Sequence, residues 1–311
     1  MIERYLAIWL ILLSALGYSW PTLTGSQGFD PFVQSQPTLF YLIACIMFMV
    51  GSLLPEEEIR LVGRRWPLVV FGTALQYTSM PFFAYLFGHL FRLGPDEFIG
   101  VIMVGCVPGA MASNVLTLLA RGNVSYSVTL TTSATMLSPL VVPLALWMLL
   151  GKSGEIDPVR VAMDLLKQVV GPVVIGFLLA RRIEPLRRFM LKWGASFANL
   201  VILWVIAVVV AVNRDRLLQG EWSLLAALLA VNGFGYLAGY LGGLAVGLDE
   251  AERRALTLEI GMQNAGLGTV LVLTLFPDRP EAAVAPAIYT FGCMWTGTLL
   301  ARFWSTRPVR G

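Results

Sequence analysis

Long apolar runs recur along the whole chain, separated by short polar loops. Hydrophobic residues make up 57% of the 311 residues and charged residues only 13%, whereas an ordinary soluble domain has roughly 25% charged residues. A bilayer requires roughly 20 apolar residues for each helical crossing. No polar stretch between the runs is long enough to hold a separate soluble domain. The sequence therefore predicts an all-α polytopic membrane protein.

We expect ten membrane segments, with both chain ends on the cytoplasmic side of a bacterial-type inner (plasma) membrane. Fifteen of the 22 Lys and Arg residues then fall on the cytoplasmic side, as the positive-inside rule requires. The first run also resembles a signal peptide, but its pattern recurs throughout the chain, which favours a first membrane helix. The ten predicted segments cover 5–20, 38–53, 66–91, 98–119, 124–150, 161–180, 195–212, 224–246, 255–276 and 282–303.

Ten helices divide into two groups of five, at 1–150 and 151–311. Because five is odd, the second group must enter the membrane inverted relative to the first. The fourth and ninth segments are then counterparts in two inverted repeats. Both carry helix-breaking residues, and interrupted segments at matching positions of two halves are a sequence signal for a transporter binding site.

The two interrupted segments also carry similar polar pairs. In the fourth segment Pro108 is followed by Ser113 and Asn114, and in the ninth segment Gln263 and Asn264 lie among glycines. Each pair belongs to a run rich in small residues. The identity between the two runs is weak, but it falls on the two segments with the strongest helix-breaking signals.

Glu259 is the only charged residue in the ninth segment, 255–276. A carboxylate at membrane depth costs at least ~2.5–3.5 kcal/mol unless something compensates it. No Lys or Arg lies within the segment, so a bound cation is the natural partner. Gln263 lies four residues further on and shares a helix face with Glu259. The segment therefore indicates an ion-coupled transporter.

The polar side chains of the apolar runs are mostly hard oxygen donors, which suit Na⁺ and offer nothing to soft transition metals. Other interpretations are open: the hydroxyls can bond to their own helix, Gln76 can join two helices, and Glu259 can be a protonated structural group or a proton carrier. One carboxylate neutralises one Na⁺, and an anionic substrate would balance a second. The donors are Gln76, Asn114, Ser127, Thr131, Thr135, Glu259, Gln263 and Asn264.

Four motifs together resemble the bile acid:sodium symporter family, over nearly the whole chain. The resemblance implies a panel domain of segments 1, 2, 6 and 7 and a core domain of segments 3–5 and 8–10. It also implies that segments 4 and 9 are unwound and cross at mid-membrane. The motifs are Pro108-Gly-Ala-Met-Ala-Ser113-Asn114-Val, Ala120-Arg-Gly-Asn, Ser127-Val-Thr-Leu-Thr131 and Glu259-Ile-Gly-Met-Gln263-Asn264-Ala-Gly-Leu.

The resemblance further implies two Na⁺ sites behind the crossing. The first would use Ser113, Asn114, Ser127, Thr131 and Glu259. The second would use Gln76, Glu259, Gln263 and the backbone carbonyls of Ile260 and Met262. The substrate is expected at Met111, Ala112, Asn264 and Met294. Met111 stands where many members of the family have a hydroxyl, so the resemblance does not identify the substrate.

The expected function is Na⁺-coupled uptake of an organic anion, a small carboxylate or bile-acid-like molecule, by alternating access. A proton-coupled carrier and an efflux carrier are the close alternatives, and a channel is a more distant one. The chain lacks the catalytic groups that an intramembrane enzyme needs, because it has one histidine, and we expect no buried Asp–Asp pair and no serine with a plausible base. No nucleic acid and no obligatory protein partner is expected.

Overall fold

The computed structural model describes residues 6–25, 28–53, 66–151, 157–212, 214 and 222–307. Every named element among these residues is a helix. An apolar chain favours this outcome, because a helix satisfies its own backbone hydrogen bonds where lipid offers none. The predicted all-α class is confirmed for the part of the chain that the structure describes.

The helices follow one another with short connections. In the first half they are α1 (Leu6–Thr24), α2 (Pro31–Gln34), η2 (Gln36–Thr38), α3 (Leu39–Leu53), α5 (Trp66–Leu90), α6 (Pro95–Cys106), α7 (Ala112–Leu119) and α8 (Val124–Leu150). In the second half they are α9 (Pro158–Leu165), η4 (Leu166–Val170), α10 (Gly171–Arg182), α11 (Glu184–Phe189), η5 (Met190–Gly194), α12 (Ala195–Val212), α14 (Trp222–Ala245), α15 (Glu250–Gly261), α16 (Ala265–Leu275), η6 (Pro280–Ala283) and α17 (Val284–Ser305).

The predicted boundaries agree with the observed helices to within a few residues, with informative exceptions. The predicted segment 195–212 coincides with α12, and α1 continues to Thr24, past the predicted end at residue 20. The sixth segment starts before residue 161 because the side chain of Asp157 accepts a hydrogen bond from Val159 N at 2.9 Å and caps α9. Such a cap satisfies a backbone donor at the helix start.

Five helices of the described residues are long and apolar enough to cross a membrane, or six if a pair bent by 54° counts as one span. The five are Pro31–Leu53, Val124–Leu150, Pro158–Arg182, Trp222–Ala245 and Pro280–Ser305. The fourth and ninth predicted segments do not reach that length in one piece. Each is split, into α6 and α7 of 12 and 8 residues and into α15 and α16 of 12 and 11 residues.

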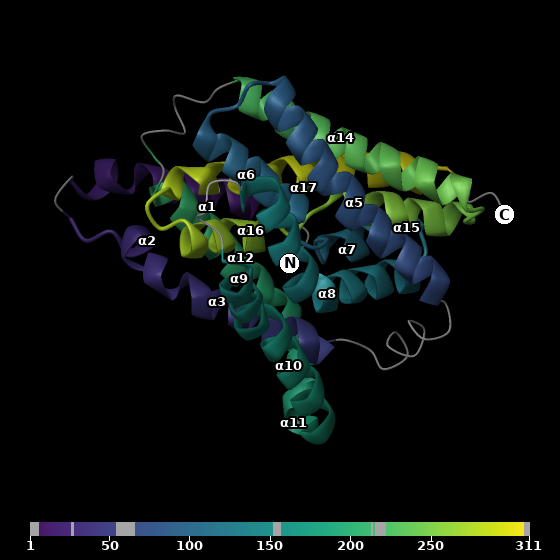
Figure 1. The fold of residues 1–311 in the computed structure, drawn as a ribbon. Coiled ribbons are helices and arrows are strands. Elements are labelled where there is room, and N and C mark those ends of the chain that lie inside the picture. Colours follow the sequence, from purple (N-terminus) through teal and green to yellow (C-terminus); the bar gives the residue numbers. More distant parts are fainter. Residues whose placement is uncertain are drawn as a thin grey trace.

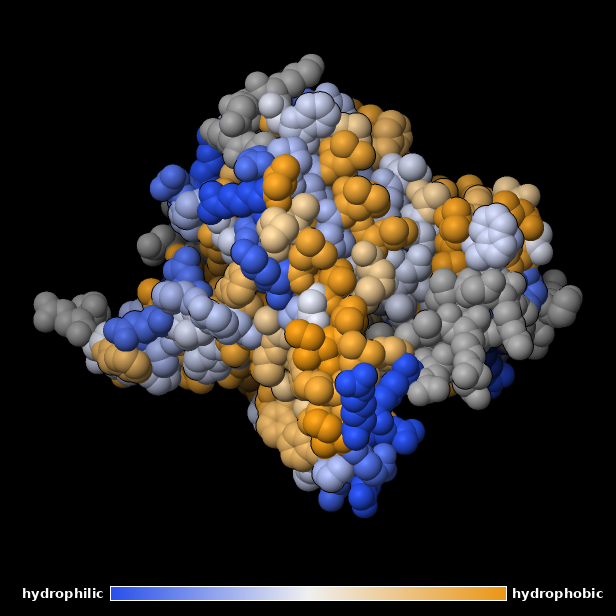
Figure 2. Space-filling view, turned by 60° about the horizontal axis from the view of Figure 1, so that its bottom comes forward, coloured by the Kyte–Doolittle hydropathy of each residue, from blue (hydrophilic) through white to orange (hydrophobic). Residues whose placement is uncertain are grey.

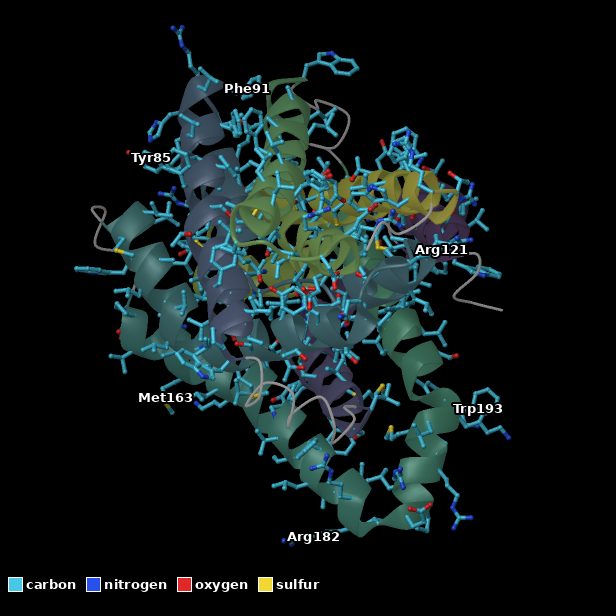
Figure 3. The ribbon with its side chains drawn as sticks, turned by 90° about the vertical axis from the view of Figure 1, so that its right-hand side faces the viewer. Tyr85, Phe91, Arg121, Met163, Arg182 and Trp193 are labelled. Atoms are coloured by element: carbon cyan, nitrogen blue, oxygen red, sulfur yellow. The ribbon has the colours of Figure 1, made fainter. Side chains whose placement is uncertain are left out.

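The helices pack in two groups (Figure 1). In one group α3 packs against α10 and α12, and α1 packs against α12. In the other group α14 packs against both α5 and α15, and α5 also packs against α6 and α8. Helices α10 and α11 form a hairpin that extends away from the second group, and Arg182 lies at its tip (Figure 3).

Large apolar side chains cover much of the outer surface. They include Trp66, Leu140 and Trp222, with exposed fractions of 61%, 71% and 84%. Figure 2 shows a continuous hydrophobic band over the centre of one face, with hydrophilic residues gathered toward its margins. An apolar area of this extent has no place in water. It fits the lipid contact of a membrane-spanning protein.

Candidate functional site: two interrupted helices meeting at Glu259

Helix α6 ends where the sequence supplies a proline. Pro108 has no backbone N–H and disfavours helical geometry for the residue before it. Val107 is accordingly extended, with φ −70° and ψ 156°. The chain resumes helical geometry as α7 at Ala112. The interruption therefore has a local cause that can be read from the sequence.

Helix α15 ends in a similar way, without a proline. Met262 is extended, with φ −112° and ψ 97°. Asn264 then caps α16, because its side-chain oxygen accepts a hydrogen bond from Leu267 N at 3.1 Å. Asparagine is among the preferred residues at this position. The side-chain oxygen of Asn264 is thus already bonded to its own helix.

The two interruptions lie against each other and exchange hydrogen bonds. Ala110 N donates to Met262 O at 2.7 Å, and Asn264 N donates to Pro108 O at 2.8 Å. Gly109 and Gln263 form an isolated antiparallel bridge between these two bonds. Backbone groups that an interrupted helix leaves free must find partners at membrane depth. Here each interruption supplies hydrogen-bond partners for free backbone groups of the other.

We call the contact between the two interruptions, at Gly109 and Gln263, the crossing. Glu259 lies beside it, in the last turn of α15, and is 1% exposed. Its Oε2 accepts a hydrogen bond from Ser113 Oγ at 2.5 Å and one from Thr131 Oγ1 at 2.8 Å. Its Oε1 is buried and accepts no hydrogen bond from any described residue. Gly109 lies so close that a Cβ atom added there would overlap Oε1. The free carboxylate oxygen therefore faces the crossing.

No basic residue among those described forms an ion pair with Glu259. A buried carboxylate without a cationic neighbour is costly. A small cation at Oε1 would offset that cost with its charge, and the hydroxyl oxygens of Ser113 and Thr131 lie beside the same carboxylate. The described residues contain no group of three or more His, Cys, Asp or Glu side chains that could hold a metal ion. The donors fit an alkali cation such as Na⁺.

Two buried glutamines lie on the other side of Glu259. Gln76 Nε2, from α5, donates to Gln263 Oε1 at 3.3 Å, and Gln263 Nε2 donates to Ile260 O at 2.8 Å. Both side chains are 1% exposed. The structure therefore brings Gln76, Gln263 and the carbonyl of Ile260 together. The Met262 carbonyl also lies at the crossing, where it accepts the hydrogen bond from Ala110.

Ser127 is a predicted ligand that does not contact the carboxylate directly. Its hydroxyl oxygen lies 3.3 Å from Thr117 Oγ1, which donates to it, and no described hydrogen bond joins it to Glu259. Thr131 connects the two, because its hydroxyl lies 3.0 Å from Ser127 O and 3.4 Å from Asn114 Oδ1. That hydroxyl has one proton, and the carboxylate is the strongest of its three acceptors.

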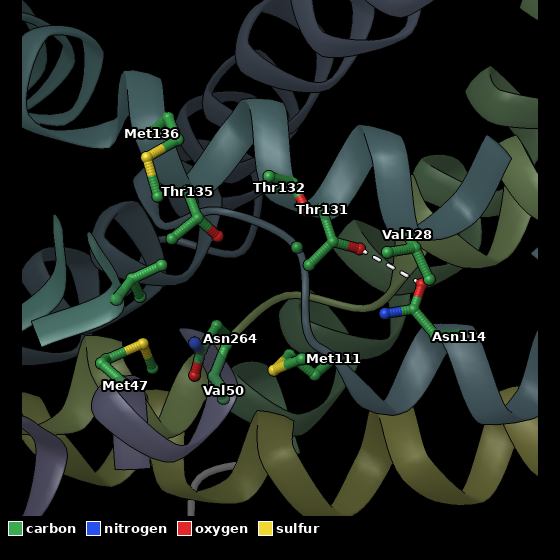
Figure 4. Close-up of a pocket in the computed structure, with 12 residues that line it drawn as sticks. Met47, Val50, Met111, Asn114, Val128, Thr131, Thr132, Thr135, Met136 and Asn264 are labelled. Carbon is green, nitrogen blue, oxygen red and sulfur yellow. Dashed lines mark hydrogen bonds between the residues drawn. The ribbon is translucent and has the colours of Figure 1, made fainter. Parts of the chain in front are cut away.

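A pocket adjoins the crossing (Figure 4). Of the four residues expected at the substrate, Met111 and Asn264 line this pocket, whereas its lining among the described residues does not include Ala112 or Met294. Across from Met111 and Asn264, α8 contributes a row of threonines. Asn114 and Thr131 line the pocket and also belong to the hydrogen-bonded group around Glu259. The lining residues are Met47, Val50, Gly109, Met111, Asn114, Val128, Thr131, Thr132, Thr135, Met136, Val173 and Asn264.

Some residues of this site were not predicted from the sequence. Met47, Val50 and Val173 are ordinary apolar residues of α3 and α10, and nothing in the sequence distinguishes them from lipid-facing neighbours. Asn232 is different. It is the one amide in the predicted segment 224–246, and its Nδ2 donates to Gly261 O at 2.7 Å. A lone amide in an apolar run was the signal that could have found it.

Interrupted helices that meet beside a buried ionisable group, inside an apolar helical body, define the class of secondary transporters. A model of the Sodium Bile acid symporter family matches residues 40–220. The sodium-dependent transporter YocS of Bacillus subtilis is 33% identical over 304 residues, 96% of this chain and 90% of its own. The chain therefore belongs to the sodium bile acid symporter family, whose members are sodium-dependent transporters and not enzymes.

Two further relatives show how widely the family extends. The human ileal sodium/bile acid cotransporter is 28% identical over 263 residues, which are 81% of this chain and 74% of that one. The probable sodium/metabolite cotransporter BASS1 of Arabidopsis thaliana chloroplasts is 32% identical over 233 residues, which are 75% of this chain and 58% of that one. The names of these two relatives share sodium and differ in the second solute, which is a bile acid in one and a metabolite in the other.

Proposed function

We propose that this protein couples the inward movement of Na⁺ to the uptake of an organic anion by alternating access. The observation that carries the proposal is Glu259, whose Oε1 is buried without a hydrogen-bond partner among the described residues, at the contact of two interrupted helices. The carboxylate supplies the charge that a cation requires. The neutral donors around it supply the remaining coordination.

Two sodium sites share this carboxylate in our proposal. Ser113 and Thr131, which already touch Oε2, form the first site together with Asn114 and Ser127. The second site uses Gln76, Gln263 and the carbonyls of Ile260 and Met262. Support comes from the number of oxygen donors, which exceeds what one small cation can coordinate on one side of a carboxylate.

The proposed architecture is ten helices in two inverted repeats, 1–150 and 151–311, with both termini cytoplasmic. It is supported by the interruptions, which fall in the fourth helix of one half and the fourth helix of the other. The packing groups support the panel and core domains, because α1, α3, α10 and α12 pack together, as do α5, α6, α14 and α15. Rocking of one group against the other would expose the crossing to each side in turn.

The pocket is the proposed substrate site. It lies between the two packing groups, because α3 and α10 line it from one group and the interruptions line it from the other. Among the described residues its polar lining consists of amides and threonine hydroxyls, without a charged side chain. A small anion would be held by neutral donors and by the partial positive charge at the starts of α7 and α16. Bound Na⁺ would supply the balancing charge.

The first test compares the stability of the purified protein in matched NaCl and KCl. A ligand present at about 100 times its dissociation constant adds ~2.7 kcal/mol to the free energy of unfolding. We expect a clear rise of the melting temperature in NaCl and a further rise with some small carboxylates or sulfonates. Equal melting temperatures in the two salts would contradict Na⁺ binding. Stabilisation by acid alone would favour the proton-coupled alternative.

The second test addresses the number of ions. Two Na⁺ with one monoanion move one net charge, worth about 2.3 kcal/mol at 100 mV, and a tenfold Na⁺ gradient adds about 1.4 kcal/mol per ion. Uptake into proteoliposomes loaded with K⁺ should therefore speed up when valinomycin makes the interior negative, with a Hill coefficient for Na⁺ above one. Potential-independent uptake of a monoanion with hyperbolic Na⁺ dependence would point to one ion per cycle.

A further inference from the structure

Three consecutive carbonyl groups at the end of α15 have three different kinds of partner. Ile260 O accepts from the Gln263 side chain, and Met262 O accepts from Ala110 N, so both lie at the crossing. Gly261 O, between them, is held from other helices. It accepts from Asn232 Nδ2 of α14 at 2.7 Å and from Tyr289 OH of α17 at 2.8 Å.

Both donors are buried, with exposed fractions of 3% for Asn232 and 1% for Tyr289. The orientation of the Asn232 amide is determined, since Gly261 O can only accept and must face the Nδ2 group. The oxygen of that amide accepts from Thr296 Oγ1 at 2.8 Å. Tyr236 OH lies 3.2 Å from the same Thr296 oxygen. Both the nitrogen and the oxygen of the Asn232 amide are therefore hydrogen-bonded, which holds its Nδ2 group against Gly261 O.

The peptide unit between Gly261 and Met262 is held at both ends. Its carbonyl has the two donors just described, and its N–H, on Met262, donates to Leu258 O at 3.0 Å. A peptide unit is planar, so these bonds together set the direction of the whole unit. The ring of Tyr236 lies against Gly261 Cα, where an added Cβ would overlap it. The unit therefore has little freedom to rotate.

We infer that Asn232 and Tyr289 are positioning residues for sodium binding. By holding the Gly261 carbonyl toward α14 and α17, they keep the Ile260 and Met262 carbonyls turned to the crossing, where the second sodium site is proposed. The inference rests on the proposed function. It adds two residues that contact no ion and act through the backbone of α15.

The decisive variant is Tyr289→Phe, because it removes one hydroxyl and leaves the ring in place. We expect the Na⁺ concentration that gives half of the thermal stabilisation to rise about three- to tenfold, the range for one lost hydrogen bond. The double variant with Asn232→Leu should raise it more than tenfold. Thr290→Val is the matched control, since among the described residues the Thr290 hydroxyl donates only to Pro286 O in its own helix, at 3.0 Å.

The readout separates positioning from general stability. A purely structural role would lower the melting temperature of Tyr289→Phe in KCl and leave the half-saturating Na⁺ concentration at the wild-type value, which would overturn the inference. If the wild-type protein shows no response to Na⁺, the proposed function fails and the inference fails with it. If the wild type responds and Tyr289→Phe matches it, only the inference is wrong. The Asn232→Leu variant is not needed for this decision.

Discussion

Two kinds of helix interruption occur in this protein, and they differ in what completes them. At the crossing, the chain leaves helical geometry between α6 and α7 and between α15 and α16, and the two segments bond to each other. In the sixth predicted segment, the π-helical turn η4 joins α9 to α10 without ending the helix. In the first kind, backbone groups bond to a segment distant in the sequence. In the second kind, the helix continues through the irregular turn.

The polar side chains differ in the same way. Around the crossing, Ser113 and Thr131 converge on Glu259. In η4, Gln168 is fully buried, and neither atom of its amide has a hydrogen-bond partner among the described residues. π-turns often occur at functional sites, but of these two interruptions, as far as the described residues show, only the crossing brings hydroxyl donors to a charged side chain. A local irregularity alone is thus a weaker functional signal than two irregularities that complete each other.

The largest expected effect concerns the charge at the crossing. Glu259→Gln keeps the shape of the side chain and removes the negative charge that both proposed sites share. Na⁺-dependent uptake should fall at least about 100-fold, equivalent to ~2.7 kcal/mol. Uptake assays in proteoliposomes would measure it, with the exposed Glu184→Gln of α11 as the control. Normal Na⁺-dependent uptake by Glu259→Gln would mean that the carboxylate is structural.

A smaller effect is expected from crowding the crossing. Gly109→Ala places a methyl group against Glu259 Oε1 and should destabilise the protein by about 1–3 kcal/mol, as overpacking does. Gly292→Ala is the matched control, because a Cβ there meets no atom within 4 Å and alanine favours a helix over glycine by up to about 1 kcal/mol. Thermal unfolding in KCl compares the two. Equal melting temperatures would show that the crossing tolerates expansion.

The smallest effect is expected in the π-turn, and its sign is opposite. Gln168→Leu removes a buried amide that has no partner among the described residues, so the free energy of unfolding should rise, by about 1 kcal/mol. Uptake and its Na⁺ dependence should stay at wild-type levels. Thermal unfolding and uptake assays would check both. A loss of uptake would mean that Gln168 binds a transported species, and the contrast between the two interruptions would disappear.

Several parts of the site follow from short stretches of sequence. Pro108 ends α6 because it lacks an N–H, and Asn264 starts α16 because its side chain caps the helix. The isolation of Glu259 in an apolar run already predicts a bound cation. The gathering of Gln76, Ser113 and Thr131 near it was predicted only through the family resemblance, since no local pattern links them to Glu259.

The sequence by itself determined the helical membrane class, the two places where helices break and the one charged residue of the apolar segment 255–276. These depend on local chemistry: apolar length, a missing N–H and a carboxylate without a basic neighbour. Only the tertiary structure decided which groups meet. Ser113 reaches Glu259 across 146 positions and Gln76 reaches Gln263 across 187, while Asn232 holds a carbonyl that no pattern assigned to it. Such contacts depend on how whole helices pack, and packing is a property of the complete chain.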